Sequence, residues 1–321
     1  MPTKYAAISL AAGLFLLAVK FFAYSITGSN AILSDALESI VNVTAASVAL
    51  FVVRLSKKPA DADHPYGHGK AEYFSATFEG GLITFAGIAI ILESIRDFGS
   101  KNALQEIDSG LWLTIGAGLV NGVLGLTLKS IGKEHKSDAL VASGIHLLSD
   151  LITTVGVTVG LILVKLTGII AFDSITAIVV ASYLIYSGYK VIRSSSSALM
   201  DAEDPESVSE LKKIIEKYAY PGIIRIHALR VMRSGHYHHI DAHVVVPEFW
   251  DVQKTHNETN KYENKVIKEY SYDGEVHFHV DPCRRVYCEM CDLPNCQVRT
   301  KEFKGKPPLT VDELTSPVEP L

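Results

Sequence analysis

Residues 138–164 have the sequence DALVASGIHLLSDLITTVGVTVGLILV, which is long and apolar enough to cross a lipid bilayer as a helix. The stretch nevertheless carries His146 and Asp150, four residues apart. Side chains at this spacing project from the same face of a helix. An ionisable group is costly inside a membrane, so the pair is predicted to have a function. An imidazole beside a carboxylate is a compact clamp for a metal ion.

A second polar pair with the same spacing, Glu38 and Asn42, lies in residues 31–53, AILSDALESIVNVTAASVALFVV. The alternative is that these side chains only hydrogen-bond one helix to another, particularly in the case of Asn42. A buried carboxylate such as Glu38 needs a proton or a positive partner. Asp35 is either a further ligand or a residue at the outer end of the span. Two facing pairs would supply the four ligands of a tetrahedral divalent cation.

The composition separates a membrane half from a polar half. The chain has 321 residues, of which 48% are hydrophobic, and its mean hydropathy of +0.22 is too high for an ordinary soluble protein. The apolar residues are concentrated before about residue 200. The net charge of -5 is small, so no nucleic-acid partner is expected. The start of the chain lacks the pattern of a removable signal peptide.

Six membrane spans of about 20 residues are predicted. They are residues 5–27, 31–55, 72–97, 110–132, 138–166 and 170–193. Basic residues follow the second, fourth and sixth spans, namely Arg54, Lys57, Lys58, Lys70, Lys129, Lys133, Lys136, Lys190 and Arg193. The positive-inside rule therefore places both termini in the cytoplasm. We expect an integral protein of the cell (inner) membrane of a bacterium.

The chain is predicted to have three parts: a transmembrane domain (1–200), a histidine-rich cytoplasmic domain (201–283) and a cysteine-containing tail (284–321). The middle part has alternating helix and strand patterns in the order α-β-β-α-β, which gives two helices packed on a small sheet. The helices are 206–218 and 251–270, and the strands are 223–233, 237–246 and 275–280. The tail has no hydrophobic periodicity, so we expect it to be irregular unless a metal orders it.

The loop after the second span carries Asp61, His64 and His68. Two imidazoles and a carboxylate within eight residues can close on one divalent ion. Asp63 competes with Asp61 for the carboxylate role. The alternative is a solvated loop with scattered polar residues.

Eight of the twelve histidines fall in the soluble part: His227, His236, His238, His239, His243, His256, His277 and His279. His277 and His279 alternate on the last strand and should point the same way, and Asp281 follows them. An imidazole-rich surface with carboxylates favours zinc, copper or nickel. A surface that senses pH, or ordinary surface histidines, would explain some of them.

All four cysteines lie together, as Cys283, Cys288, Cys291 and Cys296. Their spacing is compatible with a structural or sensing zinc site made of thiolates. A reducing cytoplasm argues against disulfides. Free thiols are the main alternative, and an iron–sulfur cluster is a further one.

Four segments in a fixed order carry a resemblance. They are LSDALESIVNV (33–43), PADADHPYGHGKAE (59–72), HLLSD (146–150) and HVDPC (279–283). With the histidine-rich domain, they resemble the cation diffusion facilitator family over about residues 5–283. The resemblance implies a homodimeric metal-ion/proton antiporter with six spans and a metallochaperone-like cytoplasmic domain, which exports zinc or a related divalent ion.

The resemblance also implies the positions of three kinds of site. The transport site would comprise Glu38, Asn42, His146 and Asp150. The loop site would comprise Asp61, His64 and His68. The sites of the cytoplasmic domain would comprise His227, His243, His256, His279 and Asp281. No role carries over to the cysteine tail, which lies outside the common core of the family.

The span-two pair departs from the family pattern, because zinc transporters of this kind usually have Asp/Asp or His/Asp where this chain has Glu38 and Asn42. Zinc is the first expectation for the cation, as substrate and as regulator, and manganese, iron, cobalt, nickel and cadmium remain open. Protons arriving from the far side would displace the ion from its ligands. The rival hypothesis is a membrane metal sensor that does not transport. No nucleophile–base pair, phosphate loop or metalloprotease motif indicates an enzyme.

Overall fold

The computed structural model describes residues 2–27, 30–96, 108–169 and 171–318. At some helical positions the description covers the backbone but not the side chain, and these include residues 30–38. The chain divides into two compact units, residues 1–200 and 201–321. The predicted end of the transmembrane domain therefore coincides with a structural boundary, and the tail belongs to the second unit.

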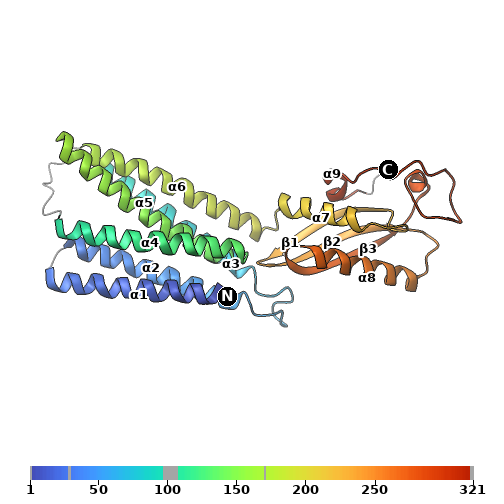
Figure 1. Ribbon diagram of the computed structural model, residues 1–321, viewed down its shortest axis with the longest axis horizontal. Coiled ribbons are helices and arrows are strands. Elements are labelled where there is room, and N and C mark those ends of the chain that lie inside the picture. The colour runs from blue at the N-terminus through green and yellow to red at the C-terminus, as the bar shows by residue number, and fades with distance from the viewer. Residues whose placement is uncertain (1, 28–29, 97–107, 170, 319–321) are drawn as a thin grey trace. The chain divides into compact units, whose positions relative to one another are not determined.

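Among its described residues, the first unit has six long helices (Figure 1). They are α1 (Pro2–Thr27), α2 (Asn30–Leu55), α3 (Ala71–Arg96), α4 (Asp108–Glu134), α5 (Asp138–Thr167) and α6 (Ala171–Leu199). Each predicted span corresponds to one of these helices. Over the described residues, five are long and apolar enough to cross a membrane, and α2 contributes the shorter apolar stretch Ser39–Leu55. The prediction of an α-helical membrane domain is confirmed.

The helices of the first unit pack mainly in pairs, α1 with α2, α3 with α6, and α4 with α5. The close approach of α4 and α5 depends on two glycines. A Cβ atom added to Gly144 would lie 2.8 Å from the backbone oxygen of Gly125, which is too close for any larger residue. Small residues at such crossings are the usual way for membrane helices to pack closely. This contact brings the polar residues of α4 within reach of those on α5.

One buried carboxylate joins the ends of three helices. Glu72, at the start of α3, is only 5% exposed. The hydroxyl of Ser56, just after α2, donates to Glu72 Oε1 at 2.8 Å, and that of Ser137 donates to Oε2 at 2.6 Å. The backbone N–H of Ala139, in the first turn of α5, is 3.4 Å from Oε2. Helix N-termini have N–H groups without intrahelical acceptors, so a carboxylate is well placed there.

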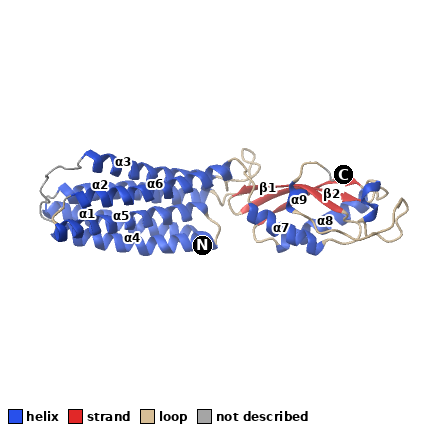
Figure 2. Ribbon diagram, turned by 90° about the horizontal axis from the view of Figure 1, so that it is seen from above, coloured by secondary structure: helices blue, strands red, loops and turns tan. Residues whose placement is uncertain are grey.

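The second unit has two helices packed on a three-stranded sheet. Its elements are α7 (Pro205–Tyr218), β1 (Arg225–Ser234), β2 (Tyr237–Val246), α8 (Val252–Glu269) and β3 (Asp273–Pro282). The strand order is β1-β2-β3, with β1 and β2 antiparallel and β2 and β3 parallel. Figure 2 shows the strands in red beside the helices α7 and α8. The predicted order α-β-β-α-β is therefore confirmed.

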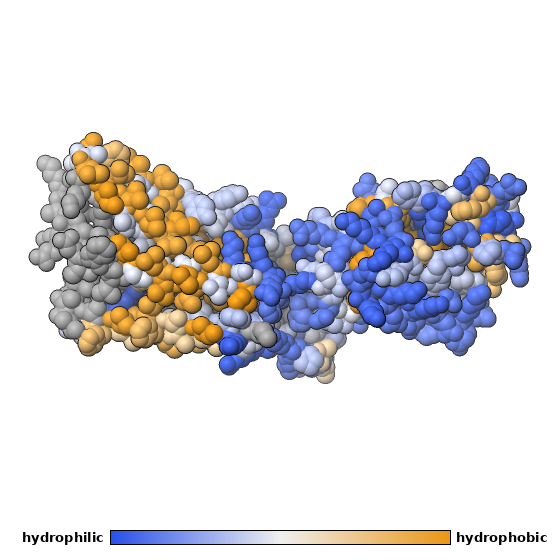
Figure 3. Space-filling model, in the orientation of Figure 1, coloured by the Kyte–Doolittle hydropathy of each residue, from blue (hydrophilic) through white to orange (hydrophobic). Residues whose placement is uncertain are grey.

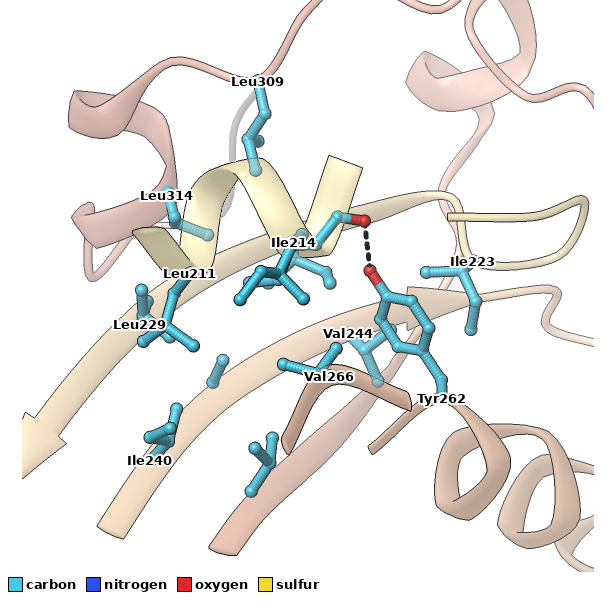
Figure 4. Packing of buried hydrophobic residues seen from close by; sticks show 14 of the residues in the cluster. Leu211, Ile214, Ile223, Leu229, Ile240, Val244, Tyr262, Val266, Leu309 and Leu314 are labelled. Atoms are coloured by element: carbon cyan, nitrogen blue, oxygen red, sulfur yellow. Dashed lines mark hydrogen bonds between the residues drawn. The ribbon is translucent and has the colours of Figure 1, made fainter. Parts of the chain in front are cut away.

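The core of the second unit lies between the helices and one face of the sheet (Figure 4). Leu211 of α7 and Ile240 and Val244 of the sheet meet there with almost no exposure. Tyr262 of α8 is fully buried, and its hydroxyl donates to the backbone oxygen of Ile215 at 2.7 Å. The opposite face of the sheet is left for the odd-numbered residues of β2 and β3, because side chains alternate along a strand.

The end of the tail also belongs to this core. It contains a short 3-10 helix, η1 (Arg285–Glu289), and a short helix, α9 (Val311–Thr315). Leu309 and Leu314 are 5% and 0% exposed and lie in the core cluster. Glu313 forms a bidentate ion pair with Arg225 of β1. The prediction of a tail that stays irregular without a metal is thus wrong for this part, because apolar contacts and an ion pair hold it.

Replacing Leu314 with alanine should destabilise the second unit by about 2–5 kcal/mol, the usual loss when a large buried aliphatic side chain is truncated. Hydrogen exchange of the full-length protein, read by mass spectrometry, should show faster exchange of the β1 amides. The matched control is Val311→Ala on the same short helix, because Val311 is 39% exposed. Equal protection of β1 in wild type and Leu314→Ala would contradict the assignment of the tail to the core.

Candidate metal-binding sites

The first candidate site lies inside the helices of the first unit, between α2 and α5. The side-chain amide of Asn42 donates to Asp150 Oδ2 at 2.9 Å. His146 Nε2 lies 3.1 Å from Asn42 Oδ1. His146 is 8% exposed, whereas Asn42 and Asp150 are half-buried, so the site is partly shielded from solvent. The structure thus brings together three of the residues that the sequence predicts for one cation site.

The hydrogen bonds of this site define which atoms carry protons. An amide oxygen can only accept, so His146 Nε2 carries the hydrogen that it shares with Asn42. The amide N–H₂ group of Asn42 in turn donates a hydrogen bond to the Asp150 carboxylate. A cation that binds His146 through Nε2 and Asn42 through Oδ1 must displace this proton. In a neutral imidazole this hydrogen would move to Nδ1, whereas an imidazolium would release a proton, so only the protonated ring exchanges a proton for the cation.

Two polar residues that the sequence reasoning missed adjoin this site. Asn121 of α4 donates to Asp150 Oδ2 at 3.4 Å. Lys20 of α1 is 8% exposed and donates to Ser39 Oγ of α2 at 2.8 Å. Both line a cavity of about 30 Å³ together with Asn42, which is room for one or two water molecules or an ion. The only signal in the sequence is that each is a single polar residue within an apolar helix. Such a residue is as compatible with a hydrogen bond between two helices as with a place beside a cation site.

Two predicted ligands cannot be placed in this site. Asp35 and Glu38 belong to α2, but their side chains lie outside the described part of the structure. Ser39 and Asn42, which are described, show that this stretch of α2 faces α1 and α5. Glu38 therefore stays a predicted ligand, and Asp35 an optional one.

The second candidate site is in the loop between α2 and α3. One ligand atom each from Asp61, His64 and His68 lie within 4.8 Å of one another. His64 Nδ1 is 3.2 Å from Asp61 Oδ1, and His68 Nε2 is 3.7 Å from Asp61 Oδ2. Asp63, the rival carboxylate, is exposed and not part of this group.

Local contacts orient the loop ligands. His68 Nδ1 lies 3.3 Å from the backbone oxygen of Lys58, which leaves Nε2 facing Asp61. A metal ligand typically donates its second ring N–H in this way. The hydrogen bond from the Lys58 ammonium keeps the pKa of Asp61 well below its usual value, so this carboxylate is ionised at neutral pH. Lys58 also competes with any cation for Asp61.

The third candidate site is on the face of the sheet opposite α7 and α8. His227, His243 and Asp281 come from β1, β2 and β3, and their ligand atoms lie within 4.8 Å of one another. His243 Nδ1 is 2.9 Å from Asp281 Oδ2, and His227 Nε2 is 3.7 Å from the same oxygen. His279 extends the group, with Nε2 3.6 Å from Asp281 Oδ1.

The strand register explains this meeting. His227 pairs with His243, and His243 pairs with His279, so three histidines stand in one row across the sheet. A bulge in β1 follows His227, where Ala228 has a φ of 52° and the pairing shifts before Arg230. A bulge changes the direction of the strand and of its side chains. Ala228 also donates its backbone N–H to Ser316 in the tail at 2.9 Å.

Other histidines of the second unit lie elsewhere. His256 is exposed on α8 and does not join the group of His227. His277 faces the same side as His279 but lies beside Glu275, with Nε2 3.5 Å from Oε2. His239 contacts the same Glu275 at 2.7 Å. His238 is 1% exposed and hydrogen-bonds the Tyr270 hydroxyl, which is a role in the core.

The four cysteines are not assembled in the described structure. All four are free thiols. Among the described residues, no three of their sulfur atoms lie within 4.8 Å of one another. Burial raises the pKa of Cys283 and of Cys291. Burial also acts to raise that of Cys288, but hydrogen bonds from Thr300 and Lys301 outweigh it and lower the pKa. A metal would have to draw these thiols together.

His227 should make the metal-free second unit sensitive to acid. Burial, and then the neighbouring His243, lower the pKa of His227 below its ordinary value of 6.5. The unfolded chain binds this proton more readily, so stability falls as the pH drops below about 6.5. We expect His227→Gln to reduce the loss of thermal stability between about pH 7.5 and about pH 5.5 in the chelator-treated protein. His256→Gln, at an exposed position, is the control; an equal effect of both variants would refute the assignment.

Comparison with known proteins agrees with this geometry. Residues 6–200 match the cation efflux transmembrane domain, and residues 204–283 match the cytoplasmic domain of cation efflux proteins. A protein of Synechocystis sp. described as an uncharacterized transporter is 35% identical over 314 residues, which is 98% of each chain.

Two further relatives are described as cation-efflux pumps FieF. That of Pectobacterium carotovorum is 30% identical over 89% of this chain and 94% of its own. That of Yersinia pestis is 30% identical over 87% of this chain and 93% of its own. Since the matches extend through both units, the chain belongs to the cation diffusion facilitator family, whose members are integral membrane transporters of metal cations and not enzymes.

Proposed function

We propose that this protein exports a divalent transition-metal cation, zinc in the first instance, from the cytoplasm in exchange for protons. The observation that carries the proposal is the linked group of Asn42, His146 and Asp150 between α2 and α5. Nitrogen and carboxylate oxygen ligands together suit zinc and its neighbours. With the predicted ligand Glu38, which is on the same helix as Asn42, the site would have the four ligands of a tetrahedral ion.

Proton exchange follows from the hydrogen bonds that the cation replaces. In the metal-free site His146 Nε2 donates its hydrogen to Asn42 Oδ1, and the Asn42 amide donates to Asp150 Oδ2. If His146 is protonated on both ring nitrogens, a bound cation takes the place of the Nε2 proton, which is released, because the ligand nitrogen must be deprotonated. Protons entering from the opposite side reverse the step and release the ion. An inward proton gradient then drives export when the site opens to each side in turn.

The other two sites fit roles on the cytoplasmic side, where we place both termini. The group of Asp61, His64 and His68 would receive the ion in the loop next to α2. The group of His227, His243, His279 and Asp281 would sense cytoplasmic metal. In a homodimer, ions bridging two copies would favour the transporting state. The exposed His256 is then a ligand available to a second copy.

The cysteine tail stays a predicted zinc site that is separate from transport. Arg299 donates to the backbone oxygens of Cys288, Cys291 and Leu293 at 2.9–3.0 Å, which already folds the segment without metal. A zinc ion bound there would therefore adjust an existing loop. The rival function is a membrane metal sensor that does not transport. It would use the same metal-binding residues, so only a measurement of metal flux distinguishes the two.

Asp150→Ala should abolish transport, because no solvent carboxylate can replace the ligand inside the membrane. We expect zinc flux into proteoliposomes under an imposed proton gradient to fall at least about 100-fold, more than the loss of an outer partner causes. The control is Asp138→Asn, an exposed carboxylate on the same helix.

Three results would reject parts of this proposal. Near-normal flux of Asp150→Ala would remove the site assignment. Wild-type flux that is indifferent to the proton gradient would remove the exchange mechanism. A wild-type protein that binds zinc but moves none would favour the sensor.

Asn42→Asp should change which metals are transported. The variant adds a carboxylate, which favours oxygen-preferring ions such as manganese over nickel. A change of about tenfold in the manganese-to-nickel flux ratio corresponds to ~1.4 kcal/mol of binding free energy. Asn121→Ala, which removes the longer bond to Asp150 without adding charge, should keep the wild-type order. The selectivity role is lost if the competition flux assay gives the same order of metals for Asn42→Asp and wild type.

A further inference from the structure

A hollow of about 400 Å³ lies in the wall of the first unit, between α4, α5 and α6. Three lysines line it: Lys129 and Lys133 near the end of α4, and Lys190 toward the end of α6. The start of α5 completes it. Alternate helices run in opposite directions, so these parts all lie at the same end of the bundle.

The charge of the hollow is positive. None of its three lysines has an ion pair or hydrogen bond with a described residue. Asp138 is the one carboxylate among the described residues that line it. The hydroxyl groups of Tyr183, Tyr186 and other lining residues add hydrogen-bond donors. Such a site fits an anion that can accept several hydrogen bonds, which is the chemistry of a phosphate group.

The hollow is separate from the cation site. Ile145, Ser149 and Ile152 of α5 line it. Successive residues of a helix are 100° apart, which places this face roughly 120° around α5 from His146 and Asp150. A path lined by three ammonium groups would also repel a divalent cation. The hollow is therefore not part of the route of the transported ion.

Exposed apolar side chains continue from the hollow along the same helix faces. Leu126 is one turn before Lys129 on α4 and is 62% exposed, and Val179 is one turn before Tyr183 on α6 and is 65% exposed. The visible surface of the first unit changes in the same way, from hydrophobic over the helices to hydrophilic at this end (Figure 3). A cationic recess next to an apolar surface matches a molecule with an anionic head and hydrocarbon chains.

We propose that this hollow binds the headgroup of an anionic phospholipid, with the acyl chains lying against α4 and α6. Basic pockets between membrane helices on the cytoplasmic side are a known means of holding such headgroups. The three lysines supply the charge, and the tyrosine and serine hydroxyls bind the phosphate oxygens. The lipid would bridge α4 and α6, the helices on either side of α5.

Native mass spectrometry of the full-length protein, with phosphatidylglycerol and phosphatidylcholine supplied in equal amounts, tests this. Wild type should retain phosphatidylglycerol preferentially. Lys129→Gln/Lys133→Gln/Lys190→Gln should lower the ratio of bound phosphatidylglycerol to phosphatidylcholine by about tenfold or more, since each lysine near a membrane surface adds to anionic-lipid binding. The conservative arginine triple variant should keep the ratio.

A charge-matched control separates the hollow from general surface charge. Lys4→Gln/Lys57→Gln/Arg193→Gln removes the same charge at the same end of the helices, outside the hollow. The proposal is overturned if this control lowers the ratio as much as the hollow variant, or if the hollow variant changes only the oligomeric state. Displacement of the lipid by millimolar inorganic phosphate would likewise overturn it, in favour of a free-phosphate site.

Discussion

The structure of the membrane unit depends on keeping one carboxylate, Asp150, inside an apolar bundle. A carboxylate there must be hydrogen-bonded or paired, because an apolar surrounding solvates its charge poorly. Asn42 from α2 and Asn121 from α4 both donate to it. The close crossing of Gly125 and Gly144 lets α4 come near enough for this. The hydrogen bonds that Asp150 accepts thus constrain how α2, α4 and α5 face one another. A bound cation could stabilise the same carboxylate in place of these donors.

The three candidate sites use the same chemistry at different depths. Each has a carboxylate in contact with imidazoles or linked to one through an amide, and the supporting elements differ. In the membrane site the groups come from separate helices and His146 is buried. In the loop they come from one short segment, and His64 is 57% exposed. Exposed ligands exchange quickly with solvent, which suits capture, whereas buried ligands suit a step that must be closed to one side.

The sequence predicted site residues best where polar or ionisable residues occur at the spacing of a helix or a strand. The spacing of His146 and Asp150 predicted one helix face, and the strand period predicted that His277 and His279 share a side. What the sequence could not give was partners from other elements. Asn121 and Lys20 are single polar residues in apolar helices, so nothing local shows that they meet Asn42. The burial of Leu314 is accompanied by an ion pair between its neighbour Glu313 and Arg225, which are far apart in the chain.

Charge is segregated around α5, and this segregation connects the two functions of the helix. One face carries His146 and Asp150 toward α2, where we propose that the cation binds. The other face borders three lysines, where we propose that an anionic headgroup binds. In a low-dielectric surrounding, opposite charges on two sides of one helix would attract strongly if they shared a cavity. The packed width of α5 keeps them apart, so a lipid bound outside can steady α4 and α6 without drawing the cation from its path.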